Sequence, residues 1–184
     1  MKKIYLLLII LIATRVVAQN KDYMLSMQGL GSLKLGMRQD EIEKILNQQL
    51  KIKDAKDTVD VVYSDTAKVK YKTIPVQLEF HRTYNESVGF HMRLIGIKAS
   101  SPLCKTESGI GVGSDKLSII NTYDDYSVNI QQGYVNYYET EKGKGKSTIS
   151  VTDDSGQYMI RWFLFNNKVI SFELQADFSA ELTD

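Results

Sequence analysis

GLGSLKLGMRQDEIEKIL, residues 29–46, is the stretch from which we interpret the rest of the chain. Its glycines permit tight turns that other residues avoid. Two acidic residues then fall where the first turn of a helix favours negative charge. Apolar residues follow at the three- and four-residue spacing of one helix face, so we predict a helix over residues 38–49. The apolar residues of that face are Ile42, Ile45 and Leu46.

A second stretch, GIGVGSDKLSIINTY at residues 109–123, has the same order of features. Alignment without gaps at an offset of 77 residues places Ile42 on Ile119. Farther along, residues 95–99 resemble residues 170–174 at an offset of 75. Repeats at a fixed period indicate a duplicated structural unit. The alternative is chance similarity between two amphipathic helices preceded by glycines.

The sequence after each predicted helix alternates apolar and polar residues, which is typical of half-buried antiparallel strands. The fold class is therefore α+β. We predict two tandem helix-plus-β-meander units that form one antiparallel sheet with both helices packed on one face. The predicted strands cover residues 59–64, 68–72, 76–81, 90–99, 128–139, 147–152, 158–165 and 168–175.

Residues 1–18 have the layout of a secretory signal peptide. Two lysines precede an apolar run at 4–13, and small residues precede a cleavage point between Ala18 and Gln19. The run is shorter than the roughly 20 residues that span a membrane. We therefore expect a secreted or periplasmic protein without stable membrane insertion after cleavage. Because Arg15 lies close to the cleavage point, an uncleaved anchor is the alternative.

These patterns divide the chain into six segments, with Pro102 as a breaker between the two units. The predicted segments are a signal peptide at 1–18, an N-terminal arm at 19–28, repeat unit 1 at 29–99, a linker at 100–108, repeat unit 2 at 109–176 and a C-terminal tail at 177–184.

The charge and cysteine content exclude several classes of function. Removal of the three basic residues in the signal lowers the 23 basic residues to 20 against 22 acidic ones, so the net charge becomes −2. A mildly acidic chain does not attract nucleic acid or anionic lipid. Cys104 is the single cysteine, so no intramolecular disulfide can form, and we expect a small buried hydrophobe there.

Two short motifs carry a resemblance to known proteins: Leu-Gly-Met at 35–37 and Val-Gly-Ser at 112–114, each followed by a short helix and a β-meander. Over about residues 26–176 this pattern resembles the β-lactamase-inhibitor-protein fold. It is also similar to outer-membrane assembly lipoproteins of the SmpA/OmlA type. The inhibitor-like proteins carry the unit twice, which implies one long curved sheet with helices on one side.

The chain departs from both groups. One cysteine cannot supply the disulfide that typically stabilises each inhibitor unit, and no cysteine stands at the mature N-terminus to be lipidated. The resemblance therefore implies a fold and leaves the activity open.

The last two predicted strands flank Asn166 and Asn167, which suit a two-residue hairpin turn. This turn predicts that Phe165 faces Lys168, and it places a run of aromatic and aliphatic residues on the side turned away from the helices. Such an exposed face would bind a protein partner. In the alternative, the N-terminal arm or a one-residue register shift buries Trp162.

The predicted hairpin also pairs Phe163 with Ile170 and Met159 with Leu174, on the side of the helices together with Phe172. The partner-binding candidates are Tyr158, Ile160, Trp162 and Leu164, beside Val169, with Tyr134, Tyr137 and Tyr138 from the preceding strand region.

Glu79, His81 and His91 are the nearest approach to a metal set. Glu79 and His81 share one strand face, and His91 falls on the expected neighbouring strand, so the three could hold zinc. The alternative, which we favour, is polar residues on a solvated face, with no cofactor.

We therefore predict a secreted, non-enzymatic protein-binding module, inhibitor-like or adaptor-like, that presents a sheet face to an unknown protein partner. One alternative is a cell-envelope structural or assembly factor that uses its helix side or its edges. Another is a hydrolase or metal-dependent enzyme, which the lack of a recognisable Ser/His/Asp spacing disfavours.

Overall fold

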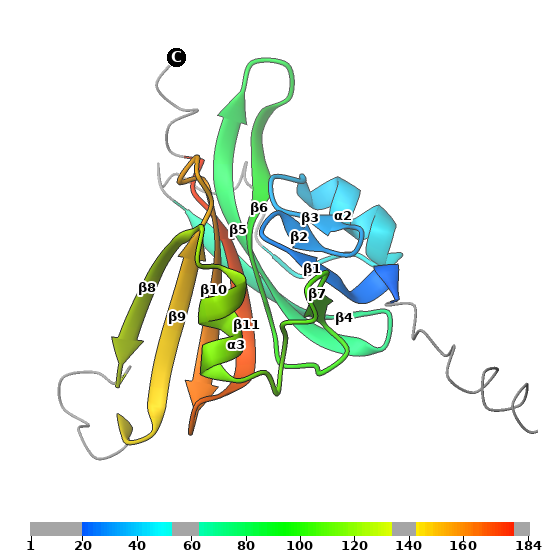
Figure 1. Ribbon diagram of the computed structural model, residues 1–184. Helices are drawn as coiled ribbons and strands as arrows, with labels where there is room; N and C mark the ends of the chain where they lie inside the picture. Colours follow the sequence, from blue (N-terminus) through cyan, green and yellow to red (C-terminus); the bar gives the residue numbers. More distant parts are fainter. Residues whose placement is uncertain (1–19, 53–62, 134–142, 179–184) are drawn as a thin grey trace, which may run out of the picture.

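The computed structural model describes residues 20–52, 63–133 and 143–178, and its strands form two sheets (Figure 1). The large sheet is antiparallel, with strand order β4-β5-β6-β11-β10-β9-β8. Its strands are β4 (Ser64–Tyr71), β5 (Ile74–Asn85), β6 (Gly89–Ala99), β8 (Ser127–Gln132), β9 (Lys146–Thr152), β10 (Tyr158–Phe165) and β11 (Lys168–Ala176).

A small second sheet, which we did not predict, is present beside the large one. It has the order β3-β2-β1-β7 and consists of β1 (Met24–Ser26), β2 (Gly29–Leu30), β3 (Leu33–Lys34) and β7 (Lys105–Thr106). The segment predicted as an N-terminal arm contains the 3-10 helix η1 (Lys21–Tyr23) and β1. β1 pairs in parallel with β7, which lies in the predicted linker, so these two segments join the halves of the chain.

Two α-helices are described, α2 (Gln39–Leu46) and α3 (Lys116–Thr122). Ile42 of α2 and Ile119 of α3 are fully buried in the same core as the inward side chains of the large sheet. The small sheet contributes to this core too, so all these elements cover one face of the large sheet, here named the helix side. α2 is shorter than predicted because Asn47 adopts a left-handed conformation that ends it.

The two helices are attached to the large sheet by matching backbone contacts. The Gly36 N–H donates to the Leu94 carbonyl at 2.7 Å, and the Gly113 N–H donates to the Val169 carbonyl at 2.8 Å. Both glycines have a φ of 92°, a conformation that favours glycine. The two donors are 77 residues apart and the two acceptors are 75 apart. These are the two offsets found when the sequence is aligned with itself.

Two β-bulges also recur at the spacing of 75 residues. The pairing of β5 with β6 moves from Glu79–Gly96 to Phe80–Leu94 and so skips Ile95. The pairing of β10 with β11 skips Ile170 in the same manner. A bulge adds one residue to one strand and bends it, so both hairpins bend at the matching position.

The bulge at Ile170 changes the predicted register of the last hairpin. Asn166 and Asn167 are left-handed and Phe165 faces Lys168, as predicted. Beyond the turn the prediction was wrong, because Phe163 faces Ser171, and Met159 faces Gln175. The extra residue lets Val169 and Phe172 both point to the helix side, although they are three positions apart.

The exposed face predicted for Trp162 was also wrong, since Trp162 and Leu164 are 0% exposed and Ile160 is 1% exposed. These side chains form the core against the helices. The physical reason is Arg161, which would have to be buried if its neighbours Met159 and Phe163 faced the core. The prediction is wrong for Tyr158 too: its ring is half-buried and packs edge-on against Phe178.

Several predictions fall on residues outside the described ranges. They concern Tyr134, Tyr137, Tyr138 and the signal peptide at 1–18.

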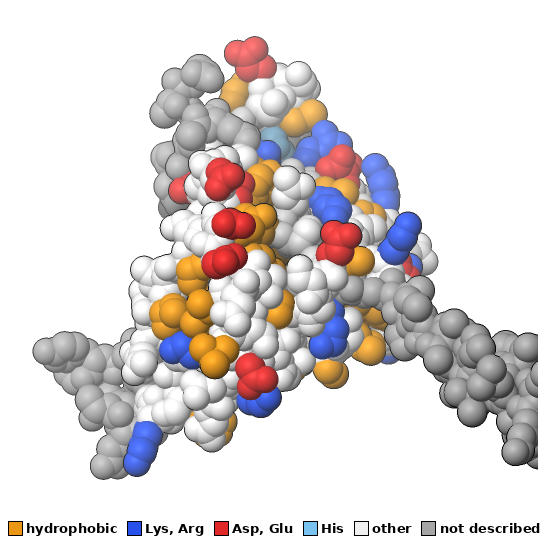
Figure 2. All heavy atoms as spheres, viewed as in Figure 1, with side chains coloured by type: hydrophobic (Ala, Val, Ile, Leu, Met, Phe, Trp, Pro, Cys, Tyr) orange, Lys and Arg blue, Asp and Glu red, His pale blue; other side chains and the backbone are white. Residues whose placement is uncertain are grey.

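The helix side carries exposed apolar side chains over α3 and next to it (Figure 2). Leu117 of α3 is 69% exposed, and Tyr126, just before β8, is 43% exposed. Ile130 of β8 is 42% exposed. α3 therefore covers the middle of the large sheet more completely than its β8 edge.

Candidate functional site

The candidate site is the face of the large sheet that points away from α2 and α3, here named the open face. None of the described helices or strands packs on it, because all of them contribute to the core on the helix side (Figure 1). Its side chains occupy the alternate strand positions, between the buried ones. It is therefore a broad surface built on rigid strands.

A row of polar side chains crosses this face from one edge to the other. At its centre Lys98 of β6 faces Glu173 of β11, and Glu173 faces Arg161 of β10. Arg161 Nη1 lies 3.2 Å from Glu173 Oε2, and Arg161 Nε lies 3.4 Å from Ser150 Oγ. The full row is Lys68, Gln77, Lys98, Glu173, Arg161, Ser150 and Asn129.

The ammonium of Lys98 lies 4.8 Å above the centre of the Phe163 ring. A cation over an aromatic face is attracted by the negative charge density of the ring. The side chain of Lys98 is nevertheless exposed, so it can reach a bound molecule. The middle of the open face thus combines an exposed cation, an aromatic ring and the partly buried Arg161–Glu173 pair.

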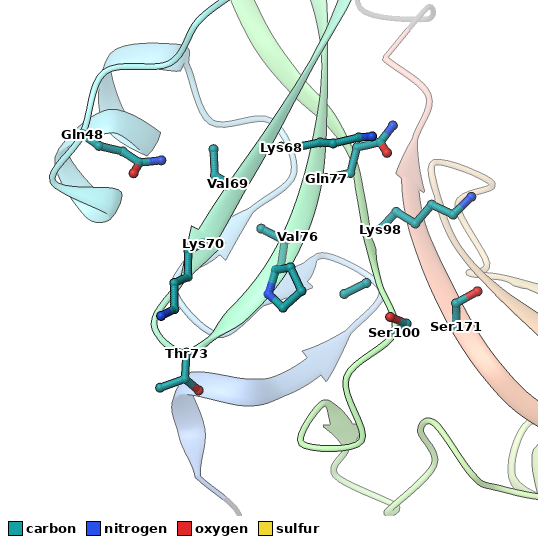
Figure 3. Close-up of a pocket in the computed structure, with 12 residues that line it drawn as sticks. Gln48, Lys68, Val69, Lys70, Thr73, Val76, Gln77, Lys98, Ser100 and Ser171 are labelled. Atoms are coloured by element: carbon teal, nitrogen blue, oxygen red, sulfur yellow. The ribbon is translucent and has the colours of Figure 1, made fainter.

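One hollow of about 590 Å³ lies at the end of β4 and β5 (Figure 3). Lys68, Gln77 and Lys98 extend on one side of the strands, while Val69 and Val76 point to the side on which α2 lies. The hollow therefore combines apolar surface with lysines of the open face. Its remaining lining residues are Gln48, Lys70, Thr73, Pro75, Ala99, Ser100 and Ser171.

A second hollow of about 680 Å³ lies at the opposite end of the open face. Glu79 and His81 of β5 line one wall, and Met159 of β10 lines another. Gly96 lies beneath Glu79, and a Cβ there would come within 3.1 Å of the Glu79 Cβ and 3.2 Å of its Oε2. The absence of a side chain at this position gives Glu79 its room.

The structure does not bring together the three residues of the predicted metal set. His81 Nε2 lies 3.8 Å from Glu79 Oε1, but His91 faces Thr83, farther along the hairpin. Its Nε2 lies 3.0 Å from Thr83 Oγ1 and its Nδ1 lies 3.0 Å from the Gly89 carbonyl. Among the described residues, no three His, Cys, Asp or Glu side chains are grouped to hold a metal ion.

Cys104 is fully buried in the core, as expected for a small apolar side chain. Burial disfavours the charged thiolate and raises the pKa of the Cys104 thiol to about 11. The thiol therefore stays protonated at neutral pH. This is the opposite of the lowered pKa that a catalytic cysteine needs.

Three residues of the polar row on the open face were not predicted as site residues from the sequence: Lys98, Arg161 and Glu173. One signal for them was present, because Arg161 is the single charged residue of YMIRWFLF, residues 158–165. In a strand with apolar residues on both faces, the face with the charge is the one turned to solvent. The meeting of Arg161 with Glu173 and Lys98 depends on strand order, which sequence spacing does not reveal.

No helix in the part of the chain that the structure describes is both long and apolar enough to cross a membrane. Comparison with protein-family models, with curated proteins and with solved structures finds no match for this chain.

Proposed function

We propose that this chain is a secreted, non-enzymatic protein-binding module that presents the open face of its large sheet to a protein partner. The observation that carries the proposal is the division between the two faces. The described helices and the small sheet all pack on the helix side, and the open face keeps exposed and half-exposed polar side chains around Phe163 and Met159. Interfaces of non-obligate complexes have this mixed composition.

The proposal includes a duplicated unit of the kind found in β-lactamase-inhibitor-like proteins. Three pairs of features support the duplication: the glycines Gly36 and Gly113, the acceptors Leu94 and Val169, and the two bulges. Lys98 and Glu173, which face each other at the junction of β6 with β11, are also 75 residues apart. The two units are then joined about an approximate two-fold axis that keeps both helices on one side.

Two double variants with equal change of charge test the proposal. Lys68→Ser with Lys98→Ser removes two exposed lysines of the open face, and Lys34→Ser with Lys44→Ser removes two exposed lysines of the helix side. Affinity capture from the cell envelope and medium, quantified by mass spectrometry, should enrich a partner with the wild-type protein. The open-face variant should lower that enrichment about tenfold, as expected for a loss of about 1.4 kcal/mol of binding free energy.

Equal thermal unfolding of both variants is the control that separates binding from folding. Loss of the partner with the helix-side variant alone would reject the open face. That result would favour the alternative, a cell-envelope structural or assembly factor. Such a factor would bind through the exposed apolar residues over α3. The other alternative, an enzyme, would require turnover that depends on Glu79 and His81.

A further inference from the structure

The outer edge of β8 is an unpaired sheet edge among the described residues. β8 ends the large sheet, and in the described part of the chain no strand pairs with its outer side. Proteins usually protect such edges with lysine, proline or a bulge, because unpaired backbone groups invite another strand. β4, at the opposite edge, has Lys68 and Lys70, whereas the sequence SVNIQQ of β8 has neither charge nor proline.

The hydrogen-bond pattern shows which backbone groups of β8 point outward. The Gly133 N–H donates to the Lys146 carbonyl at 3.0 Å, in the same register as the facing pairs of β8 with β9. Facing pairs in an antiparallel ladder alternate between bonded and non-bonded. Every second residue therefore bonds to β9, and the others direct N–H and C=O away from the sheet. The outward residues are Val128, Ile130 and Gln132.

The side chain of Ile130 is only partly covered by its neighbours. It lies on the helix side, opposite the fully buried Ile149 of β9. Because the sheet ends at β8, the outer flank of Ile130 stays in solvent, and 42% of the residue is exposed. A further strand would cover this flank and satisfy the outward backbone groups together.

We propose that β8 pairs antiparallel with β8 of a second copy of this chain, about a two-fold axis at Ile130. In this register Ile130 faces its own copy and Val128 faces Gln132. All three outward residues then form bonded pairs, each of which exchanges two hydrogen bonds, for about six in all. A register centred on Asn129 would use only two such pairs, for about four bonds.

Self-pairing suits this strand for two reasons. Its lack of charge means that two copies can lie opposite each other without like-charge repulsion. The chain also already contains an antiparallel junction between matching strands, since β6 pairs with β11 with Lys98 facing Glu173. The dimer would extend the large sheet across both copies and make their open faces continuous, which goes beyond the binding function of one chain.

Sedimentation equilibrium of the purified protein tests the proposal, with an expected mass of two chains at micromolar concentration. Ile130→Lys and Ile130→Glu should each weaken dimerisation about tenfold or more, because each places like charges in direct opposition. An equimolar mixture of the two variants should restore the dimer, since only a self-facing position brings Lys opposite Glu. Thr66→Lys, which adds the same charge to the exposed edge strand β4, should leave the dimer unchanged.

Amide hydrogen exchange gives an independent measurement on the wild-type protein. Protection of the Val128, Ile130 and Gln132 amides should rise with protein concentration, while that of Asn129 and Gln131, already bonded to β9, should stay constant. A wild-type mass of one chain at 100 micromolar protein, on the order of a weak dissociation constant, would overturn the proposal. A dimer that survives Ile130→Lys, or a mixture that stays monomeric, would overturn it as well.

Discussion

Trp162 is the largest of the fully buried side chains, and its indole N–H has no hydrogen-bond partner among the described residues. Its ring packs edge-on against Phe172, with centroids 6.1 Å apart. Burial of the indole contributes a large apolar surface to the core, while an unpaired N–H costs about 1–3 kcal/mol. The apolar contacts of the ring therefore stabilise Trp162 in the core, and the unpaired N–H reduces that stabilisation.

Replacement of Trp162 should affect folding and not partner binding. Trp162→Ala should lower the free energy of unfolding by about 3–5 kcal/mol, because it leaves a large cavity. Trp162→Phe should cost less, since it keeps a ring and removes the unpaired N–H. Urea unfolding followed by circular dichroism measures both. An unchanged midpoint for Trp162→Ala would mean that the ring lies at the surface.

At the level of elements, each helix is positioned by a glycine that turns the chain onto the edge of a strand. Arg93 reinforces the first of these contacts, since its Nε donates to the Gly36 carbonyl at 3.1 Å and its guanidinium stacks 3.6 Å above the Phe178 ring. A Cβ on Gly36 would lie 3.3 Å from Arg93 Nη2. At Gly113 a Cβ would meet no atom within 4 Å.

Alanine at the two glycines should therefore have unequal effects. Gly36→Ala and Gly113→Ala should each cost about 1–3 kcal/mol of stability, because both positions have a left-handed φ of 92°. Gly36→Ala should cost more, since it also crowds Arg93. Chemical denaturation of the two variants side by side gives the comparison. Equal losses would show that Arg93 moves aside without cost.

At the level of the whole molecule, one hydrophobic core extends across both predicted units. It includes Leu30 and Ile42 from the first and Ile119 and Phe172 from the second. The pairing of β6 with β11 also joins the units through backbone hydrogen bonds, and β1 of the predicted arm pairs with β7 of the predicted linker. The two units therefore share one core.

Thermal unfolding should consequently be a single cooperative transition. Differential scanning calorimetry should give a calorimetric enthalpy equal to the van't Hoff enthalpy, the criterion for two-state behaviour. Two resolved transitions, or a calorimetric enthalpy about twice the van't Hoff value, would mean that the units fold independently.

Local patterns predicted several elements closely. The strand predicted at 158–165 matches β10, and the paired asparagines form the predicted left-handed turn. The end of α2 differs from the prediction because Asn47 caps the helix earlier in the chain. The short strands of the small sheet were missed, because two or three residues are too few to establish a period.

The sequence by itself determined the α+β class, the position of each helix and the offset between matching elements, because these depend on neighbours a few residues apart. Only the tertiary structure decided the register of β10 against β11 beyond the turn. That outcome depends on the bulge at Ile170 and on the solvation of Arg161, which faces Glu173 from another strand. The centre of the open face likewise depends on strand order, because the order β6-β11-β10 brings Lys98, Glu173 and Arg161 together from three strands.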